Sequence, residues 1–240
     1  MCGRYALTKT QRDIESEELF SHIRSVDVAF DQLPHYNISP MQKAPVIAIR
    51  DGELVLQNMQ WWLIPHWSKS NKPSFSTFNA KSETLDQSKL FVSYFKGSRC
   101  LVPADAFYEW QKVAVSSSEK PQKKKEEKQP CCIRMKDESL FMFAGLFSVW
   151  KDAEGHELPT FTILTTEPND LMRPIHNRMP VILPPDQYEP WLDRTNKDIE
   201  TLKKSLVPYA PDKMKAYHIS NLVNSPKNDS AECLHTVEKD

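Results

Sequence analysis

The residue best equipped for covalent chemistry in this sequence is Cys2, which follows the initiator methionine. Its small side chain allows Met1 to be trimmed, which would make Cys2 the amino terminus. An amino-terminal cysteine has a free amine and a thiol on adjacent carbons, with ordinary pKa values of about 8 and about 8.5. Such a pair can attack one electrophile twice. The alternative is a buried cysteine that serves as a small hydrophobic residue, and these residues alone favour neither interpretation.

Glu109 is a candidate general acid or base. It lies in the segment 107–110, where a strand would place Phe107 and Glu109 on one face and Tyr108 and Trp110 on the other. A carboxyl group among aromatic rings is costly to ionise unless it is paired, so its pKa is expected to rise toward the range that suits proton transfer. The structural alternative is a buried salt bridge. No obvious cationic partner lies nearby in the sequence, which favours the functional interpretation.

His176 is a candidate proton shuttle. It begins a short polar stretch between apolar segments, and histidine titrates near neutral pH. A lone histidine is more often a structural residue, but Arg178, two residues further on, offers a contact for an anion such as phosphate. Asn79, followed by Lys81 and Glu83, is either a helix N-cap or a neutral group that positions an amine.

The composition is that of a globular domain. The chain has 240 residues, of which 40% are hydrophobic and 26% are charged, and its formal net charge is −1. A nucleic-acid partner would therefore be met by a local basic surface rather than by the charge of the whole molecule. Because no apolar run approaches the ~18 residues of a membrane span and no signal-peptide pattern follows Met1, we expect an intracellular protein.

The five cysteines include no CxxC pair and no zinc-type spacing with histidine. We therefore expect neither a disulfide framework nor a structural metal. Cys131 and Cys132 are adjacent in an apolar run, so a strand would point their side chains to opposite faces, where both would pack.

Strand signals dominate the chain. Apolar, β-branched segments at residues 45–50 and 53–57 flank Asp51-Gly52, which is the strongest hairpin signal present. Further strands are expected at residues 99–103, 106–111, 133–136, 140–150, 158–166 and 213–219. Helices are expected at residues 10–23, with Thr10 as N-cap, and at 88–95, 168–173, 186–192 and 196–206.

These elements predict a single α+β domain, residues 1–240, around a twisted, largely antiparallel β-sheet or barrel with inserted helices. Residues 116–130 are charged and poor in apolar side chains, so we expect a flexible charged loop at about residues 114–130. Its lysines alternate with glutamates, which favours a solvated hairpin tip over a basic nucleic-acid-binding tail or a localisation signal. Three of the six tryptophans lie within residues 59–67, where they form either core or a binding platform.

Seven ordered motifs resemble those of the SOS-response-associated peptidase (SRAP) family, the abasic-site-processing proteins that cross-link to DNA. The resemblance extends over nearly the whole chain, and any one motif alone would be weak. The motifs are MCGRY at 1–5, the tryptophan-rich stretch 61–67 with LIP at 63–65, NAKSE at 79–83, RCLVP at 99–103, FYEW at 107–110, HNRMP at 176–180, and VN at 223–224 with ECL at 232–234.

The resemblance implies an SRAP-like fold and a specific reaction. After Met1 removal, the Cys2 amine would form a Schiff base with the ring-opened aldehyde of an abasic site in single-stranded DNA. The Cys2 thiol would then close a thiazolidine, leaving a DNA–protein cross-link that shields the lesion. The second attack is intramolecular, which orientation can favour by ~7 kcal/mol or more. In this family Asn79 would hold the amine and the sugar, while Glu109 and His176 would move protons.

The resemblance also implies how the DNA is held. Arg4, Lys81 and Arg178 would contact phosphates, and Trp67 and Phe75 would stack on the single strand, which suits sequence-tolerant binding. It implies neither a cofactor nor a metal. The expected partner is single-stranded DNA containing abasic sites, bound by a monomer away from any membrane. The protein would act in the nucleus of a eukaryote or on the nucleoid in the cytoplasm of a bacterium.

The sequence departs from the family pattern at three positions. Trp62 stands where the family has glycine, and its ring is expected to reshape or block the groove there. Lys81 replaces an arginine, so it keeps the charge but loses the two-pronged contact with phosphate. Ala106 replaces a glycine. None of the four expected catalytic positions changes, so the affinity rather than the reaction is expected to differ.

Two other functions remain open on the sequence. Cys2 would also suit an amino-terminal-nucleophile peptidase or amidohydrolase, but five glycines offer few sites for the glycine-bordered oxyanion loops of such enzymes. A non-catalytic reader of modified DNA would use the aromatic groove alone. That function leaves the placement of Cys2, Glu109 and His176 unexplained.

Overall fold

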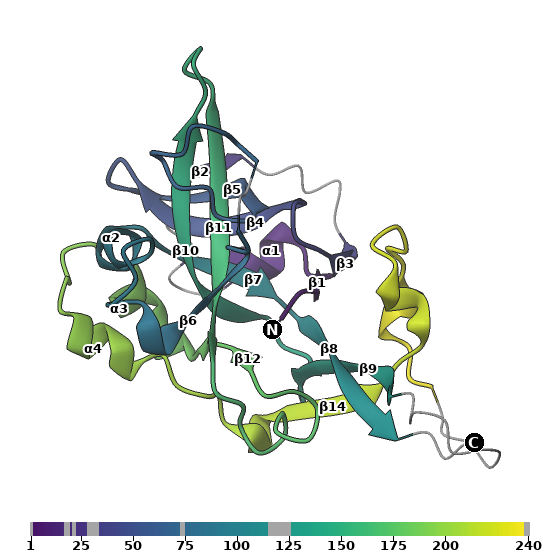
Figure 1. Cartoon of the computed structure of the whole chain (residues 1–240). Coiled ribbons are helices and arrows are strands. Elements are labelled where there is room, and N and C mark those ends of the chain that lie inside the picture. The colour runs from purple at the N-terminus through teal and green to yellow at the C-terminus, as the bar shows by residue number, and fades with distance from the viewer. Residues whose placement is uncertain are drawn as a thin grey trace.

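Two β-sheets make up most of the fold (Figure 1). The computed structural model describes residues 2–16, 20, 23–27, 34–72, 75–114 and 126–237. The first sheet has the strand order β14 (Met214–His218), β9 (Glu126–Met135), β8 (Ala106–Ala114), β1 (Tyr5–Leu7) and β3 (His35–Ile38). The second has the order β12 (Met179–Pro180), β11 (Glu157–Thr166), β10 (Phe141–Lys151), β7 (Arg99–Ala104), β4 (Lys43–Arg50), β5 (Glu53–Trp61) and β2 (Ser25–Asp27), with β6 (Asn79–Lys81) on β11 and β13 (Ile182–Leu183) on β10.

The second sheet closes on itself as a barrel. β11 pairs with β5 in parallel, through Thr160 with Gln60 and Phe161 with Trp61, so strands β11, β10, β7, β4 and β5 form a ring. Most other strand pairs are antiparallel, including β4 with β5, β10 with β11 and β8 with β9. The fold confirms the predicted single domain around a largely antiparallel sheet or barrel with few helices.

The Asp51-Gly52 hairpin has the predicted geometry. Both residues have positive φ, 51° and 86°, and they join β4 to β5 with Arg50 opposite Glu53. Positive φ at both central positions is the backbone twist that a two-residue hairpin requires. The turn therefore sets the register in which the β5 residues Met59 and Trp61 face the core.

The β10–β11 hairpin forms part of the barrel wall, and its tip projects beyond the barrel (green in Figure 1). β10 is buried along almost its whole length, as its apolar sequence predicts for a central strand. Gly145 lies where β10 passes closest to β7 and β11. A Cβ at Gly145 would come within 2.8 Å of Cys100 Sγ and 3.0 Å of the Thr162 carbonyl oxygen. Only a glycine fits this position without displacing a neighbour.

The helices are short. They are α1 (Gln11–Glu15), α2 (Val92–Gly97), α3 (Tyr188–Leu192) and α4 (Ile199–Lys204). Thr10 caps α1 in a reciprocal arrangement with Asp13, as predicted, although residues 17–19 and 21–22 of the expected helix lie outside the described residues. The prediction of a helix at residues 168–173 is wrong. That segment is a series of turns, because Asn169 Oδ1 accepts the Met172 amide at 2.9 Å and replaces a helical bond.

The loop expected at residues 114–130 needs a correction. β8 continues through Ala114 and β9 already begins at Glu126, with cross-strand pairs from Trp110 opposite Pro130 to Ala114 opposite Glu126. Residues 126–130 are therefore strand, because ladder hydrogen bonds to β8 order this polar segment even though Glu127 and Lys128 stay exposed. Residues 115–125 lie outside the described part of the chain.

Among the described residues, buried hydrophobic side chains form three clusters. The first includes Cys2, Trp61, Phe143 and Cys131, and the second lies between the barrel and α3 around Trp191. Cys132 belongs to the third, so Cys131 and Cys132 pack on opposite faces of β9 as predicted. Within the described residues, no helix has the length and apolar character needed to cross a membrane.

Candidate active site

Cys2 lies three residues before the start of β1 and is fully buried. β1 is antiparallel to β8, and the Tyr108 amide donates to the Arg4 carbonyl at 3.0 Å. One step further along this register, Glu109 lies beside residues 2 and 3. Burial, and after it the charge of the nearby Glu109, raises the pKa of the Cys2 thiol well above its ordinary value. In the folded protein this thiol is therefore protonated at neutral pH.

Glu109 occupies a buried position in the middle of β8, with only 3% of its surface exposed. Burial raises the pKa of Glu109 to about 7 because the surroundings disfavour the ionised form. The carboxyl group is thus close to half-protonated at neutral pH. This is the condition under which one group can both donate and accept a proton.

His176 faces Glu109 from the loop that follows β11. Its Nδ1 lies 3.9 Å from Glu109 Oε1. The same nitrogen lies 3.1 Å from the Arg178 amide nitrogen and 3.2 Å from the Arg178 carbonyl oxygen. When Nδ1 carries no proton it can accept from the Arg178 amide, and when it is protonated it can donate to the Arg178 carbonyl. Burial lowers the pKa of His176, so the neutral ring is the main form at pH 7.

Asn79 opens β6 and is buried against β11. Its Nδ2 donates to the carbonyls of Phe78 at 3.0 Å and Ile163 at 3.4 Å. Its Oδ1 is buried and has no hydrogen-bond partner among the described residues. A buried acceptor left in this way costs about 1–3 kcal/mol, so it marks a place where a ligand donor would be stabilising. Asn79 is not a helix N-cap, since the following 3₁₀ turn (Ser82–Thr84) is preceded by Lys81.

Trp61 links Asn79 to the strand that follows Cys2. The Trp61 indole donates to the Phe78 carbonyl at 2.8 Å, the same oxygen that Asn79 uses. The Trp61 ring packs edge-on against Tyr5, with ring centroids 5.2 Å apart. The structure thus brings Cys2, Glu109 and His176 together directly, and it connects Asn79 to β1 through Trp61.

Arg4 is held within the protein. Its guanidinium donates to Asn37 Oδ1 at 2.9 Å, to the Val223 carbonyl and to the Asn224 carbonyl at 3.2 Å. These bonds tie the residues next to Cys2 to the 3₁₀ turn Asn221–Asn224 near the other end of the chain. The expected phosphate contact of Arg4 stays a prediction, and the side chain has this structural role whether or not it meets DNA.

Arg178 also has protein partners. Its two terminal nitrogens bind the Glu83 carboxylate at 2.7 and 2.9 Å, and one of them donates to the Thr165 carbonyl at 2.6 Å. Because the Arg178 backbone contacts His176, this side chain fixes the loop on which His176 lies. A phosphate contact by Arg178 stays a prediction and requires the phosphate to share or displace Glu83.

The expected stacking residues are exposed. Trp67 and Phe75 have 61% and 52% of their surface accessible, and Lys81 is exposed on β6. Trp62 does not lie free in the groove: its indole donates to the Phe75 carbonyl at 3.1 Å, and its ring packs on Phe78 with centroids 5.1 Å apart. In place of the family glycine, Trp62 supports the segment that carries Phe75.

Ala106, the third departure from the family pattern, fits the site without distortion. It is fully buried and lies opposite Ala6 in the pairing of β8 with β1. Two methyl groups face each other at this position, so the extra carbon of Ala106 relative to glycine is accommodated next to a small neighbour.

Sequence reasoning missed the residues that hold this site in place. Gln111 donates to the Pro174 carbonyl, Glu83 binds Arg178, and the Tyr5 hydroxyl is buried without a partner among the described residues. The alternation of β8 places Gln111 on the same face as Glu109, which is a usable signal. Glu83 and Arg178 are 95 positions apart in the sequence, so their pairing has no local signal.

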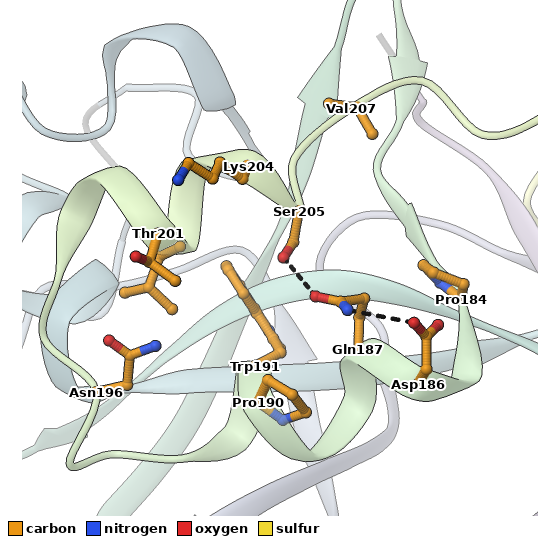
Figure 2. Close-up of a pocket in the computed structure, with 11 residues that line it drawn as sticks. Pro184, Asp186, Gln187, Pro190, Trp191, Asn196, Thr201, Lys204, Ser205 and Val207 are labelled. Atoms are coloured by element: carbon orange, nitrogen blue, oxygen red, sulfur yellow. Dashed lines mark hydrogen bonds between the residues drawn. The ribbon is translucent and has the colours of Figure 1, made fainter.

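Two other features lie outside this site. A cavity of about 450 Å³ lies between α3 and α4, and Ser205 Oγ donates to Gln187 Oε1 at 2.7 Å in its lining. Figure 2 shows the residues that line it. None of the predicted catalytic or DNA-binding residues lines this cavity.

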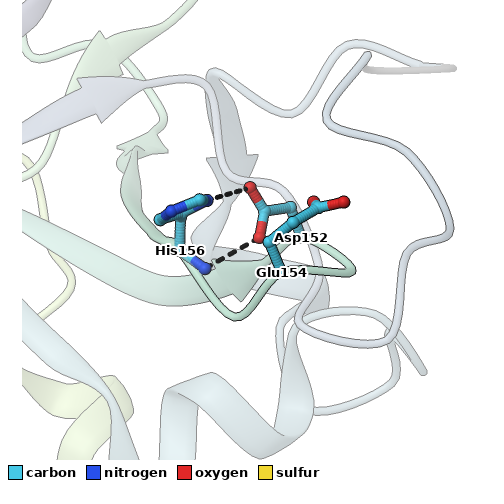
Figure 3. A group of neighbouring side chains, drawn as sticks. All are labelled: Asp152, Glu154 and His156. Atoms are coloured by element: carbon cyan, nitrogen blue, oxygen red, sulfur yellow. Dashed lines mark hydrogen bonds and ion pairs between the residues drawn. The ribbon is translucent and has the colours of Figure 1, made fainter.

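At the β10–β11 hairpin tip, Asp152, Glu154 and His156 lie close together (Figure 3). The Asp152 carboxylate accepts the His156 amide at 2.7 Å and contacts His156 Nδ1 at 2.9 Å, and these bonds close the turn.

Comparison with known proteins identifies the family. The sequence model of the SOS response associated peptidase (SRAP) family matches residues 1–226. The chain belongs to the SRAP family. The match spans Cys2, Asn79, Glu109 and His176, the four candidate catalytic residues.

Two relatives and one solved structure show the extent of the similarity. The abasic site processing protein YoaM of Bacillus subtilis (strain 168) is 38% identical over 237 residues, covering 98% of this chain and 97% of YoaM. The abasic site processing protein HMCES of Gallus gallus is 35% identical over 226 residues, covering 85% of this chain and 67% of HMCES. A crystal structure of a protein from Bacteroides thetaiotaomicron superposes with a TM-score of 0.81 at 26% identity, covering 99% of this chain and all of that one.

Proposed function

We propose that this protein senses abasic sites in single-stranded DNA and forms a covalent thiazolidine cross-link through Cys2 after Met1 is removed. SRAP membership and the names of its relatives, which are abasic site processing proteins, support the lesion as the target. The observation that carries the chemistry is the buried Glu109, with a pKa of about 7, beside Cys2 and 3.9 Å from His176.

The reaction needs no oxidant and no external nucleophile. The neutral Cys2 amine adds to the C1′ aldehyde and water leaves, which gives a Schiff base. The Cys2 sulfur then bonds to the same carbon while the thiol proton moves to the imine nitrogen, which closes the five-membered ring. The raised pKa of the Cys2 thiol supports this order, because the thiol stays protonated until the imine is in place to accept its proton.

Glu109 and His176 divide the proton transfers. Glu109 in its ionised form takes a proton from the attacking amine, and in its protonated form it gives one to the departing hydroxyl. His176, which is neutral at pH 7, lies next to Glu109. It exchanges a proton with Glu109 and so restores the starting protonation state of that carboxyl group. Asn79 orients the amine or a sugar hydroxyl through its buried Oδ1. Reversal of the cross-link uses the same groups in the opposite order.

Local groups rather than the net charge hold the DNA. Trp67 and Phe75 are exposed aromatic surfaces on which bases stack, and Lys81 supplies a phosphate contact. Arg4 and Arg178 add positive charge at the same site while they hold the protein together. The protein acts as a monomer where DNA is found, which is the nucleus of a eukaryote or the bacterial nucleoid.

The Cys2 hypothesis is tested by intact-mass spectrometry. The purified protein is expected to lack Met1 and to gain the mass of an abasic single-stranded oligonucleotide minus one water, in an adduct that survives denaturation. Cys2→Ala abolishes this adduct. Cys2→Ser keeps the amine but lacks the thiol, so it gives only a Schiff base that needs borohydride to trap.

Cys233→Ala is the matched control, because Cys233 is an equally buried thiol elsewhere in the chain. It is expected to form the adduct at the wild-type rate. An adduct that persists in Cys2→Ala, or none in the wild type, would sink the hypothesis. Peptide hydrolysis that depends on Cys2 would favour a peptidase, and tight reversible binding without an adduct would favour a non-catalytic reader.

A further inference from the structure

A row of polar side chains on the first sheet ends at the loop that carries His176. In the pairing of β8 with β9, Glu109 lies opposite Cys131, and in the pairing of β9 with β14, Cys131 lies opposite His218. Paired residues of an antiparallel ladder point to the same face, and so do residues two apart on one strand. Glu109, Gln111, Cys131 and His218 therefore share one face of the sheet.

Gln111 bridges this face to the His176 loop. Its Oε1 lies 3.0 Å from His218 Nε2, and its Nε2 donates to the Pro174 carbonyl at 3.1 Å. β9 lies between the strands of Gln111 and His218, and its small Cys131 side chain leaves room for the two longer side chains to meet. With Nε2 of Gln111 as donor, its Oε1 accepts, so His218 carries a proton on Nε2.

The hydrogen bond from Gln111 holds the carbonyl of Pro174, which lies two residues before His176. The His176 amide is held by the Met172 carbonyl at 2.9 Å, and the ring is held by Arg178 on the far side. Gln111 supplies a contact from the strand that also carries Glu109. One strand thus fixes both the carboxyl group and the approach of the loop that faces it.

We propose that Gln111, oriented by His218, is a positioning residue that sets His176 against Glu109. This inference rests on the proposed function, in which the two groups exchange protons. The 3.9 Å separation of His176 Nδ1 and Glu109 Oε1 is close to hydrogen-bond length, so a small movement of the loop makes or breaks that contact. A displacement of about 1 Å in a catalytic group can cost about 100-fold in rate.

The test compares Gln111→Glu with Gln129→Glu. Gln111 and Gln129 are direct cross-strand partners, so each change adds the same charge at nearly the same place. The carboxylate at 111 cannot donate to the Pro174 carbonyl, whereas Gln129 donates to the Ile219 carbonyl and does not touch the loop. We expect Gln111→Glu and Gln111→Ala to slow single-turnover cross-linking by roughly 10- to 100-fold, with unchanged affinity for undamaged single-stranded DNA.

The second readout does not depend on the reaction. In an NMR titration, the ring resonances and pKa of His176 are expected to change in Gln111→Glu and Gln111→Ala but not in Gln129→Glu. The charged groups that act on His176 are the terminal amine of the chain, Glu109 from β8, Lys128 from β9 and Arg178 from its own loop, and all four are retained in these variants. The pH dependence of the cross-linking rate is expected to shift with the His176 pKa.

Two outcomes overturn the positioning role. One is a Gln111→Ala variant with the wild-type rate, pH profile and His176 resonances. The other is an equal effect of Gln111→Glu and Gln129→Glu, which would mean that added charge alone is responsible. If the wild-type protein forms no adduct, the proposed function fails, and the His176 resonances of the Gln111 variants still decide whether Gln111 positions this loop.

Discussion

Glu109 should make the stability of the folded protein depend on pH. Its folded pKa of about 7 lies above its ordinary value of 4.5, so the folded state binds its proton more tightly than the unfolded state does. The contribution of Glu109 to the free energy of unfolding is therefore fully present below pH 4.5 and is lost as the pH rises through 7. Since one pKa unit corresponds to 1.36 kcal/mol, this group lowers the free energy of unfolding by about 2.5 kcal/mol between pH 5 and pH 8.

The variant Glu109→Gln removes this dependence. Relative to wild type, it is expected to gain about 2.5 kcal/mol on going from pH 5 to pH 8, because glutamine has no proton to lose. Denaturant unfolding at the two pH values measures the difference. Glu154→Gln, at an exposed position, is the control and should track wild type at both. If the free energy of unfolding changed with pH by the same amount in Glu109→Gln and in wild type, the Glu109 carboxyl group would titrate in the folded protein as it does in water.

The sequence allowed some of these residues to be singled out and not others. The alternation of Phe107, Tyr108 and Glu109 was enough to predict a buried carboxyl group, because strand periodicity is local. The occupied guanidinium groups of Arg4 and Arg178 were not predictable. Their acceptors are the carbonyls of Val223 and Asn224 and the carboxylate of Glu83, which only the fold brings near.

At the scale of elements, β10 depends on a close contact at Gly145. Gly145→Ala would place a methyl group 2.8 Å from Cys100 Sγ and 3.0 Å from a backbone oxygen of β11. Overpacking of this kind costs about 1–3 kcal/mol, and we expect a loss of that size in the free energy of unfolding, measured in denaturant. Gly97→Ala is the comparison, because a Cβ there meets nothing within 4 Å. Equal stability of the two variants would contradict the packing at Gly145.

Elements with local signals were predicted well. The Asp51-Gly52 turn and the capping box of Thr10 and Asp13 both depend on residues within a few positions of one another. The strand 126–130 was missed because its order comes from pairing with β8 rather than from its own composition. The parallel pairing of β11 with β5, which closes the barrel, joins residues about a hundred positions apart and has no sequence signal that we recognised.

At the scale of the whole molecule, the small number of phosphate contacts limits how strongly salt affects DNA binding. With three phosphate contacts, from Arg4, Lys81 and Arg178, log K for undamaged single-stranded DNA should fall with log salt concentration at a slope of about −2. Lys81→Gln should weaken binding and reduce the slope by about 0.7. Fluorescence anisotropy across a salt series measures both.

The control for this prediction is Lys197→Gln, an exposed lysine beside α4 and outside the candidate site. It carries the same charge change and should leave the slope and the affinity unaltered. A slope near zero in the wild type, or one that is the same in Lys81→Gln, would mean that phosphate contacts at this site contribute little.

The hydrogen bonds of Arg4 have a consequence for the order of events during synthesis. The first residues leave the ribosome first, but the carbonyls of Val223 and Asn224 that hold Arg4 are made last. β8, which covers Cys2, is also made long after it. Until β8 has been made, Cys2 therefore lacks the strand that covers it, although β1 can already pair with β3 and Arg4 with Asn37. On the proposed function, this interval is when the enzyme that removes Met1 has access to it, and completion of the chain closes the site around the newly freed amine.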